Sequence, residues 1–190
     1  MCGRYYIETD DDIMRDIYRE TVGNIRPELL PLLKDGGEIY PTNVVPIRIK
    51  ERHEAMKWGF ARYDGKGQII NAKSETAMEK PMFSKAMRER RCLIPASGYY
   101  EWKNENGKKI KHAFCRPNSP ILYLAGCYRL EKDSPFPVFV VLTREATPLL
   151  AEIHDRMPVI IPQRHIQDWL HGSPDIMHET LTDLRIKKVQ

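Results

Sequence analysis

The second residue of the chain, Cys2, is a candidate nucleophile because processing of the N-terminus can give it two reactive groups. Initiator methionine is normally removed when a small residue follows, and Cys2 would then carry a free α-amine beside its thiol. The ordinary pKa is about 7.7–8.0 for the amine and about 8.5 for the thiol, so each is partly nucleophilic near neutral pH. Such a 1,2-aminothiol condenses with an aldehyde to an imine and then closes to a thiazolidine, or it reacts through the thiol alone. The alternative is a small residue near a chain end that takes no part in chemistry.

Three further polar residues lie where predicted strands end or loops begin, which are positions that present side chains to a cleft. Glu101 stands between aromatic residues, and burial there would raise its pKa toward the range of acid–base catalysts, whereas simple alternation would place it in solvent. His154 can shuttle protons near neutral pH, and the adjacent Asp155 and Arg156 could fix its tautomer or hold a phosphate; it is also one histidine among six. The Asn71 amide could bind a sugar, a carbonyl or the N-terminal amine, or it could form a turn.

Basic and aromatic residues are interleaved along the chain, a pattern typical of proteins that bind single-stranded nucleic acid. Lysine and arginine would follow the phosphates while the ring of Trp58 or Phe60 stacked on an unpaired base. The charges of a helix expected over residues 81–91 are equally consistent with a solvated helix face. The interleaved residues are Arg4, Lys57, Trp58, Lys73, Arg88, Arg90, Arg91, Lys103 and Arg156.

The composition argues against several other classes of protein. The chain has 190 residues, 42% of them apolar, a net charge of +4 and four cysteines without C-x-x-C spacing. We therefore expect no zinc site, no other metal and no cofactor. The N-terminus lacks the apolar region of a signal peptide and no apolar run is long enough for a membrane helix, so we expect a soluble, intracellular protein with free thiols.

The expected elements predict a single α+β domain over residues 1–171, with a curled, mostly antiparallel, barrel-like sheet and short peripheral helices. Residues 172–190 have weak periodicity and are expected to form a tail that is partly disordered or packed on the surface. Residues 22–43 are expected to be loop-like, with a short helical turn over 28–33. The other expected elements are strands over 4–8, 44–50, 54–59, 68–71, 92–95, 99–103, 109–116, 121–129, 138–143 and 159–161, and helices that begin after an N-cap at Thr9 and over 81–91, 145–153 and 162–170.

Six separated segments, in this order, resemble the SRAP family, the SOS-response-associated peptidases, which are also called abasic-site processing proteins. The resemblance runs from residue 2 to about residue 170. The segments are MCGRY at 1–5, MKWGF at 56–60, NAKSET at 71–76, RCLIPASGYYEW at 91–102, LTREA at 142–146 and IHDRMP at 153–158.

The sequence departs from the family pattern at positions that bear on DNA binding. Lys73 stands where members of the family often have arginine, which replaces a bidentate phosphate ligand with a point charge. The segment at 60–63 reads FARY in place of a run that often ends in tryptophan, so Phe60 or Tyr63 would have to replace a second stacking ring. Residues 40–42 also depart from the usual pattern.

The resemblance implies that mature Cys2 traps the open-chain aldehyde of an abasic site in single-stranded DNA. The amine would form a Schiff base and the thiol would close a thiazolidine, which leaves a covalent DNA–protein crosslink that shields the lesion. Elimination from the Schiff base would instead cleave the strand, as in a β-lyase. By the same resemblance Asn71 would position the N-terminus or the deoxyribose, Glu101 would shuttle protons, and His154 would assist ring opening or reversal of the crosslink.

The resemblance also assigns the DNA-binding residues and the setting. Arg4, Lys73 and Arg156 would hold phosphates beside the lesion, and Trp58 would stack on a neighbouring base. We expect a monomer in the cytoplasm that associates with the nucleoid when it is bound to damaged DNA.

Two other functions remain open at this stage. In a cysteine peptidase, Cys2 would be the nucleophile, His154 its base and Glu101 the residue that orients the base, with removal of Met1 as one reaction of its own. A non-catalytic module for single-stranded nucleic acid would bind independently of the lesion and would not need Cys2.

Overall fold

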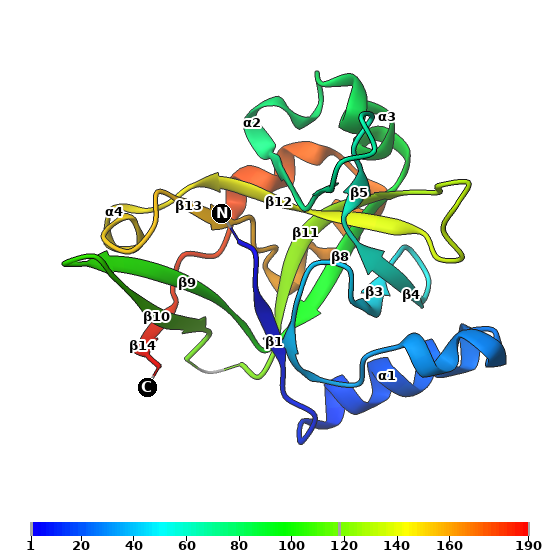
Figure 1. Ribbon diagram of the computed structural model, residues 1–190, viewed down its shortest axis with the longest axis horizontal. Coiled ribbons are helices and arrows are strands. Elements are labelled where there is room, and N and C mark those ends of the chain that lie inside the picture. Colours follow the sequence, from blue (N-terminus) through cyan, green and yellow to red (C-terminus); the bar gives the residue numbers. More distant parts are fainter. Residues whose placement is uncertain (1, 118, 190) are drawn as a thin grey trace.

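The molecule is built from two large β-sheets that meet at a bend between consecutive strands, together with a two-stranded sheet, and helices are arranged around the larger sheet (Figure 1). The structure is a computed structural model and describes residues 2–117 and 119–189. This arrangement confirms the predicted α+β class with a curled, barrel-like core.

A closed ring of five strands forms the centre of the larger sheet. In order around the ring they are β3 (Val44–Arg48), β4 (His53–Trp58), β12 (Val138–Glu145), β11 (Leu122–Arg129) and β8 (Arg91–Ala96), and β8 pairs back with β3. The β4–β12 pair is parallel and the other four pairs are antiparallel. Closure of the ring leaves these strands without a free edge, and the first six residues of β12, 138–143, are all buried.

The second sheet is antiparallel and extends away from the ring (Figure 1). Its strands, in order, are β14 (Arg185–Lys188), β10 (Lys108–Cys115), β9 (Gly98–Glu105), β1 (Tyr5–Ile7) and β2 (Gly37–Ile39). The N-terminal strand is thus held on both sides, by β9 and by β2. This double pairing fixes the start of the chain in space.

The two sheets join where β8 runs into β9 through Ser97. The Ser97 amide donates to the Tyr6 carbonyl at 2.9 Å, and its hydroxyl accepts from the Glu8 amide at 2.8 Å. A Cβ at Gly98 would lie 2.4 Å from the Phe114 carbonyl oxygen, so only glycine fits at this bend. Ser97 and Gly98 therefore form a corner between the sheets, and this corner turns β9 toward the N-terminal strand.

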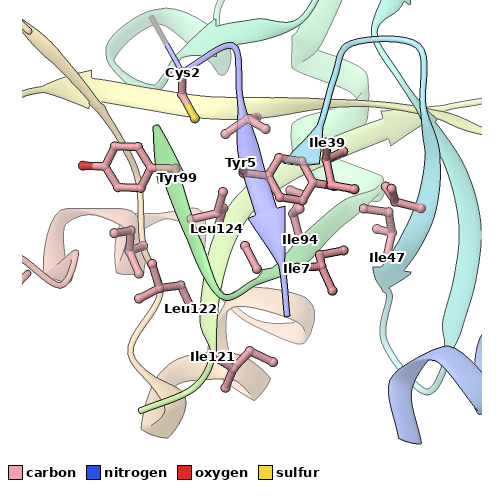
Figure 2. Packing of buried hydrophobic residues seen from close by; sticks show 14 of the residues in the cluster. Cys2, Tyr5, Ile7, Ile39, Ile47, Ile94, Tyr99, Ile121, Leu122 and Leu124 are labelled. Carbon is pink, nitrogen blue, oxygen red and sulfur yellow. The ribbon is translucent and has the colours of Figure 1, made fainter. Parts of the chain in front are cut away.

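A buried cluster fills the space where the ring meets β1 and β9. Figure 2 shows its members, with Cys2 at one end and Ile121 at the other. Cys2, Tyr5, Trp58 and Tyr99 are all buried in it. The candidate nucleophile is therefore part of the hydrophobic core.

The remaining elements are short and lie around these sheets. Helix α1 (Asp12–Asn24) packs on β3 and β4, while α3 (Pro81–Glu89) and α5 (Ile166–His171) contact β8. The other elements are α2 (Ser74–Ala77), α4 (Pro148–Ala151), the strands β5 (Phe60–Ala61), β6 (Gln68–Ile69), β7 (Asn71–Lys73) and β13 (Arg156–Pro158), and the 3-10 helices η1 (Pro27–Leu32), η2 (Gln163–His165) and η3 (Pro174–Glu179).

The predicted N-cap of the first helix was wrong by two residues. Asp11, and not Thr9, caps α1, because its Oδ1 accepts hydrogen bonds from the amides of Ile13 at 3.0 Å and Met14 at 3.1 Å. Met14 and Ile17 of this helix are buried, whereas Ile13 is exposed.

The helix predicted over residues 145–153 was also wrong in extent. Strand β12 continues to Glu145, which pairs with Arg156 of β13, and this pairing keeps the chain extended. Only α4 is helical in this segment. The strand expected over residues 159–161 lies earlier in the chain, as β13 at 156–158. The helix expected over 162–170 is divided into η2 and α5.

Residues 22–43 and 172–190 contain elements beyond those expected. The first segment includes the predicted helical turn, η1, but also the end of α1 and strand β2. The second contains η3 and β14; Met177 and Leu184 are buried, and β14 pairs with β10. Strands β10 and β14 are far apart in the chain, so their pairing cannot be recognised from local periodicity.

Two other findings bear on the setting of the protein. All four cysteines are free thiols, as predicted. None of the helices in the described part of the chain is long and apolar enough to cross a membrane.

Candidate active site

Cys2 lies buried at the start of the N-terminal strand. Tyr5 pairs with Ile39 on one side and with Tyr99 on the other, which holds this end of the chain against the core. Figure 2 shows the Cys2 side chain pointing into the cluster, with Tyr99 and Tyr5 on either side of it. Burial raises the pKa of the Cys2 thiol well above its usual range, and the nearby Glu101 carboxylate raises this pKa further. The thiol is therefore held in its neutral form.

Asn71 fixes the position of the N-terminal residue. Its Nδ2 donates a hydrogen bond to the Cys2 carbonyl oxygen at 3.0 Å. The side chain is well placed for this contact because β7 pairs in parallel with β12, with Asn71 opposite Val141. Asn71 therefore lies in a strand, so the alternative of a turn-forming asparagine was wrong.

We expect Asn71→Ala to lower the free energy of unfolding by about 1–2 kcal/mol, because a half-buried hydrogen bond is lost. Asn71→Asp should cost more, because a carboxylate oxygen in place of Nδ2 would face the Cys2 carbonyl oxygen. Urea denaturation of the two variants measures both differences, with Gln167→Ala at an exposed position of α5 as the control. An Asn71→Asp protein as stable as the wild type would contradict the assigned contact.

Glu101 is a buried carboxyl group on β9, with 4% of its surface exposed. The alternative in which alternation places it in solvent was therefore wrong. Burial raises the pKa of Glu101 above its usual value, and this rise is partly opposed by the neighbouring His154. Glu101 consequently keeps its proton to a higher pH than an exposed carboxyl group does.

His154 stands beside Glu101, in the loop before β13. Its Nε2 lies 4.0 Å from Glu101 Oε2. The Arg156 amide donates to His154 Nδ1 at 3.0 Å, while Asp155 Oδ1 lies 2.8 Å from the same nitrogen. The amide needs a lone pair on Nδ1 and the carboxylate needs a proton there. The Asp155 side chain is 85% exposed and can turn to solvent, so we assign Nδ1 as an acceptor and the ring proton to Nε2, on the side of Glu101.

The three predicted phosphate ligands differ in whether they already form an ion pair with a carboxylate of the protein. Arg4 Nη1 lies 2.8 Å from Glu38 Oε1, and its guanidinium lies over the Tyr40 ring at 3.7 Å. Lys111 shares the same Glu38 oxygen at 2.8 Å. Arg4 is thus already paired with a carboxylate within the second sheet.

Arg156 is also paired, whereas Lys73 is open to solvent. Arg156 Nη1 and Nη2 donate to the two carboxylate oxygens of Glu75, at 2.8 and 2.9 Å. These hydrogen bonds lower the pKa of Glu75 to about 2, so the pair is ionised at neutral pH. Lys73, two residues before Glu75, is exposed and forms no ion pair within the described residues.

The position of Trp58 does not support its predicted role in stacking on a DNA base. The ring is completely buried, packs against Tyr5 and Phe139 with centroid distances of 5.3 and 6.2 Å, and donates from Nε1 to the Ile70 carbonyl at 3.0 Å. Alternation along β4 turns this side chain into the core, where a base cannot reach it.

The two residues considered as replacements for a second stacking ring have opposite environments. Phe60 is completely buried and contacts Phe83 and the Arg129 guanidinium. Tyr63 is 80% exposed, in the loop between β5 and β6. Of the two, only Tyr63 has a ring face that DNA could reach.

Reasoning from the sequence missed several residues of this site. Tyr5 and Tyr99 flank Cys2, and their alternation with Arg4 and Tyr100 in two short strands could have marked them as inward-facing. Glu38 and Glu75 carried no such signal, because a carboxylate that pairs with a distant arginine looks in the sequence like any surface charge.

Comparison with known proteins places this site in a family. A sequence model described as SOS response associated peptidase (SRAP) matches residues 1–189. The chain belongs to the SRAP family. The match confirms the resemblance and extends it beyond residue 170, through η3 and β14.

Several SRAP relatives span most of the chain. The abasic site processing protein YoqW of Bacillus subtilis is 30% identical over 204 residues, which cover 95% of this chain and 86% of YoqW. The abasic site processing protein YedK of Escherichia coli is 26% identical over 178 residues, which cover 90% of this chain and 79% of YedK. A crystal structure of a protein from Bacteroides thetaiotaomicron has the same fold, with a TM-score of 0.83, 21% identity and coverage of 100% of this chain and 92% of the other.

Proposed function

We propose that this SRAP protein is an abasic-site sensor that binds single-stranded DNA and forms a thiazolidine crosslink through Cys2 once Met1 is removed. The observation that carries the proposal is the placement of Cys2, whose carbonyl is held by Asn71 and whose thiol lies near the buried Glu101 carboxyl. A reaction that needs both the amine and the thiol of one residue requires that residue to be fixed as a whole. The names of the relatives YoqW and YedK support the same lesion as substrate.

The first half of the proposed reaction forms a Schiff base. The Cys2 amine attacks the aldehyde carbon C1′ of the ring-opened deoxyribose, and the resulting carbinolamine loses its hydroxyl group as water. Glu101 suits this step because burial keeps its proton available for the departing hydroxyl. His154, with Nε2 4.0 Å from Glu101 Oε2, would help to open the sugar ring.

The second half closes the five-membered ring. The Cys2 sulfur bonds to the carbon of the protonated Schiff base, the carbon–nitrogen double bond becomes a single bond, and its electron pair stays on the nitrogen, which already carries a hydrogen. The thiol proton passes to the Glu101 carboxylate, which is thereby returned to the acid form that it had before the first half. Overall one water is released and no oxidant is consumed, and a neutral buried thiol is a suitable reactant because its proton has an acceptor within the site.

The phosphates beside the lesion would be bound by Arg4, Lys73 and Arg156. Lys73 is exposed, and the two arginines would exchange a carboxylate partner for a phosphate. The crosslink would then shield the lesion as part of a DNA damage response. We also propose that the protein is a monomer of the cytoplasm that associates with the nucleoid on damaged DNA.

A cysteine peptidase is the competing proposal, and one observation weakens it. A peptidase needs a thiolate, which usually requires a lowered thiol pKa. Burial and Glu101 have the opposite effect on Cys2. Strand cleavage by β-elimination from the Schiff base is the alternative outcome of the same chemistry, and lesion-independent binding of single-stranded DNA is the third proposal.

The proposal is tested with three single-stranded DNAs of the same sequence. One carries an abasic site, one carries the same site reduced to the alcohol with borohydride, and one is intact. The protein is first shown by mass spectrometry to lack Met1, and the products are separated on a denaturing gel after heating. We expect a slow, heat-stable band with the aldehyde alone. Equal bands with the reduced DNA, or no band at all with folded, mature protein, would overturn the proposal.

A further inference from the structure

The Glu75 carboxylate covers the outer edge of the Arg156 guanidinium, which is formed by Nη1 and Nη2. Glu75 binds it with both carboxylate oxygens, at 2.8 and 2.9 Å, in the parallel geometry that guanidinium groups also form with the two free oxygens of a phosphodiester. Arg156 is 11% exposed at its side chain, whereas Glu75 is 44% exposed. Glu75 is therefore the outer partner of the pair.

The inner side of the same guanidinium is held in place by the fold. Arg156 Nη2 donates to the Thr143 carbonyl oxygen at 2.6 Å, within the paired strands β12 and β13. The guanidinium thus stays in position whether or not Glu75 is bound to it. A ligand that replaced Glu75 would find a binding edge that is already oriented.

We infer that Glu75 occupies Arg156 in place of a DNA phosphate in the free protein, and that DNA binds by displacing it. This inference rests on the proposed function, in which Arg156 is a phosphate ligand. Lys73 supports it, because this exposed cation lies two residues before Glu75 and offers a second positive charge to the incoming phosphate. A ligand would have to compete with Glu75 for Arg156. DNA that is bound at several points would do so better than an isolated anion.

A cavity beside α2 could accommodate the displaced Glu75 carboxylate. Helix α2, which carries Glu75, has four residues and no side-chain cap, and displacement of Glu75 would also break the 3.3 Å hydrogen bond that its Oε1 accepts from the Glu145 amide. The cavity has a volume of about 240 Å³, and its lining includes Arg144, which could pair with the displaced carboxylate. The complete lining is Ser74, Glu75, Arg144, Glu145, Met177 and His178.

Displacement has a measurable electrostatic consequence. Each phosphate that a protein neutralises releases counterions from DNA, with a slope of about −0.7 in log K against log salt for single strands. In the wild type, the contact at Arg156 frees a carboxylate that takes up a counterion in return. The net release at this position is therefore reduced as long as Glu75 is charged.

The test is the affinity of Glu75→Gln for intact single-stranded DNA, measured by fluorescence anisotropy over a range of salt concentrations. Glutamine keeps the size of the side chain but binds Arg156 without a full charge. We expect affinity to rise about two- to fivefold at moderate salt, as for loss of a partly exposed ion pair, and the salt slope to steepen by up to about 0.7. Glu79→Gln, which removes an exposed charge just after α2, is the matched control and should change the slope much less.

A double variant tests whether the gain in affinity depends on Arg156. In the double variant Glu75→Gln with Arg156→Gln, the gain should vanish, because the exposed edge is gone. A loss of affinity in Glu75→Gln, or an equal gain in Glu79→Gln, would overturn the inference while leaving the crosslinking of abasic DNA by the wild type intact. Absence of any binding of single-stranded DNA by the wild type would overturn the proposed function together with the inference.

Discussion

Cys2→Ala is expected to abolish the heat-stable crosslink with abasic single-stranded DNA completely. The variant keeps an N-terminal amine after removal of Met1, but it lacks the sulfur that closes the thiazolidine. Its Schiff base remains open to hydrolysis and should disappear on heating. Removal of one buried sulfur atom costs about 1 kcal/mol or somewhat more, so the protein should still fold.

The amine that remains provides a positive signal in the same variant. Borohydride added during the reaction should trap the Schiff base of Cys2→Ala as a stable amine, which restores a band on the denaturing gel. Cys127→Ala, which alters a buried cysteine of the other core cluster, is the matched control and should crosslink like the wild type. A heat-stable band formed by Cys2→Ala without borohydride would show that the thiol is not needed and would rule out the thiazolidine.

Glu101→Gln is expected to slow formation of the crosslink by about 10²- to 10⁴-fold, the usual contribution of a general acid–base group. Glutamine preserves the shape of the side chain but neither donates a carboxyl proton nor accepts one. The rate is measured at several pH values with an excess of protein. Glu105→Gln, on the same strand and 41% exposed at its side chain, should leave the rate unchanged.

Although Glu101→Gln should slow the reaction, it should raise the free energy of unfolding at neutral pH. This combination separates a catalytic role of Glu101 from a structural one. The pKa of Glu101 is raised by burial, so the folded protein binds this proton more tightly than the unfolded chain does. The stabilisation is complete below the pKa of an unfolded glutamate and is lost as the pH rises through the higher pKa of the folded state. At neutral pH, Glu101→Gln should therefore have a higher free energy of unfolding than the wild type, and the difference should shrink on acidification. A variant that is both slower and less stable at pH 7 would indicate that Glu101 serves the fold.

The class of the fold and the chemistry available to the chain follow from residue types and their order. Short apolar segments predict short antiparallel strands, and β9 and β10 pair on either side of Asn106 and Gly107, residue types that favour a hairpin turn. The motifs around Cys2, Asn71, Glu101 and His154 marked four segments that the structure brings together. The chemistry that these side chains can perform follows from their residue types, so the candidates can be recognised from the sequence.

Which of these groups are buried and which form ion pairs depends on how the strands are arranged in three dimensions. Glu75 and Arg156 lie 81 residues apart in the chain, and their pairing follows from the way β7 and β13 flank β12. The burial of Trp58 depends on closure of the ring. Local patterns report on neighbours within about one helical turn or two strand positions, because that is the range over which backbone geometry fixes side-chain direction. The partner of a charge, and the environment that sets its pKa, depend on contacts between strands that the chain order does not encode.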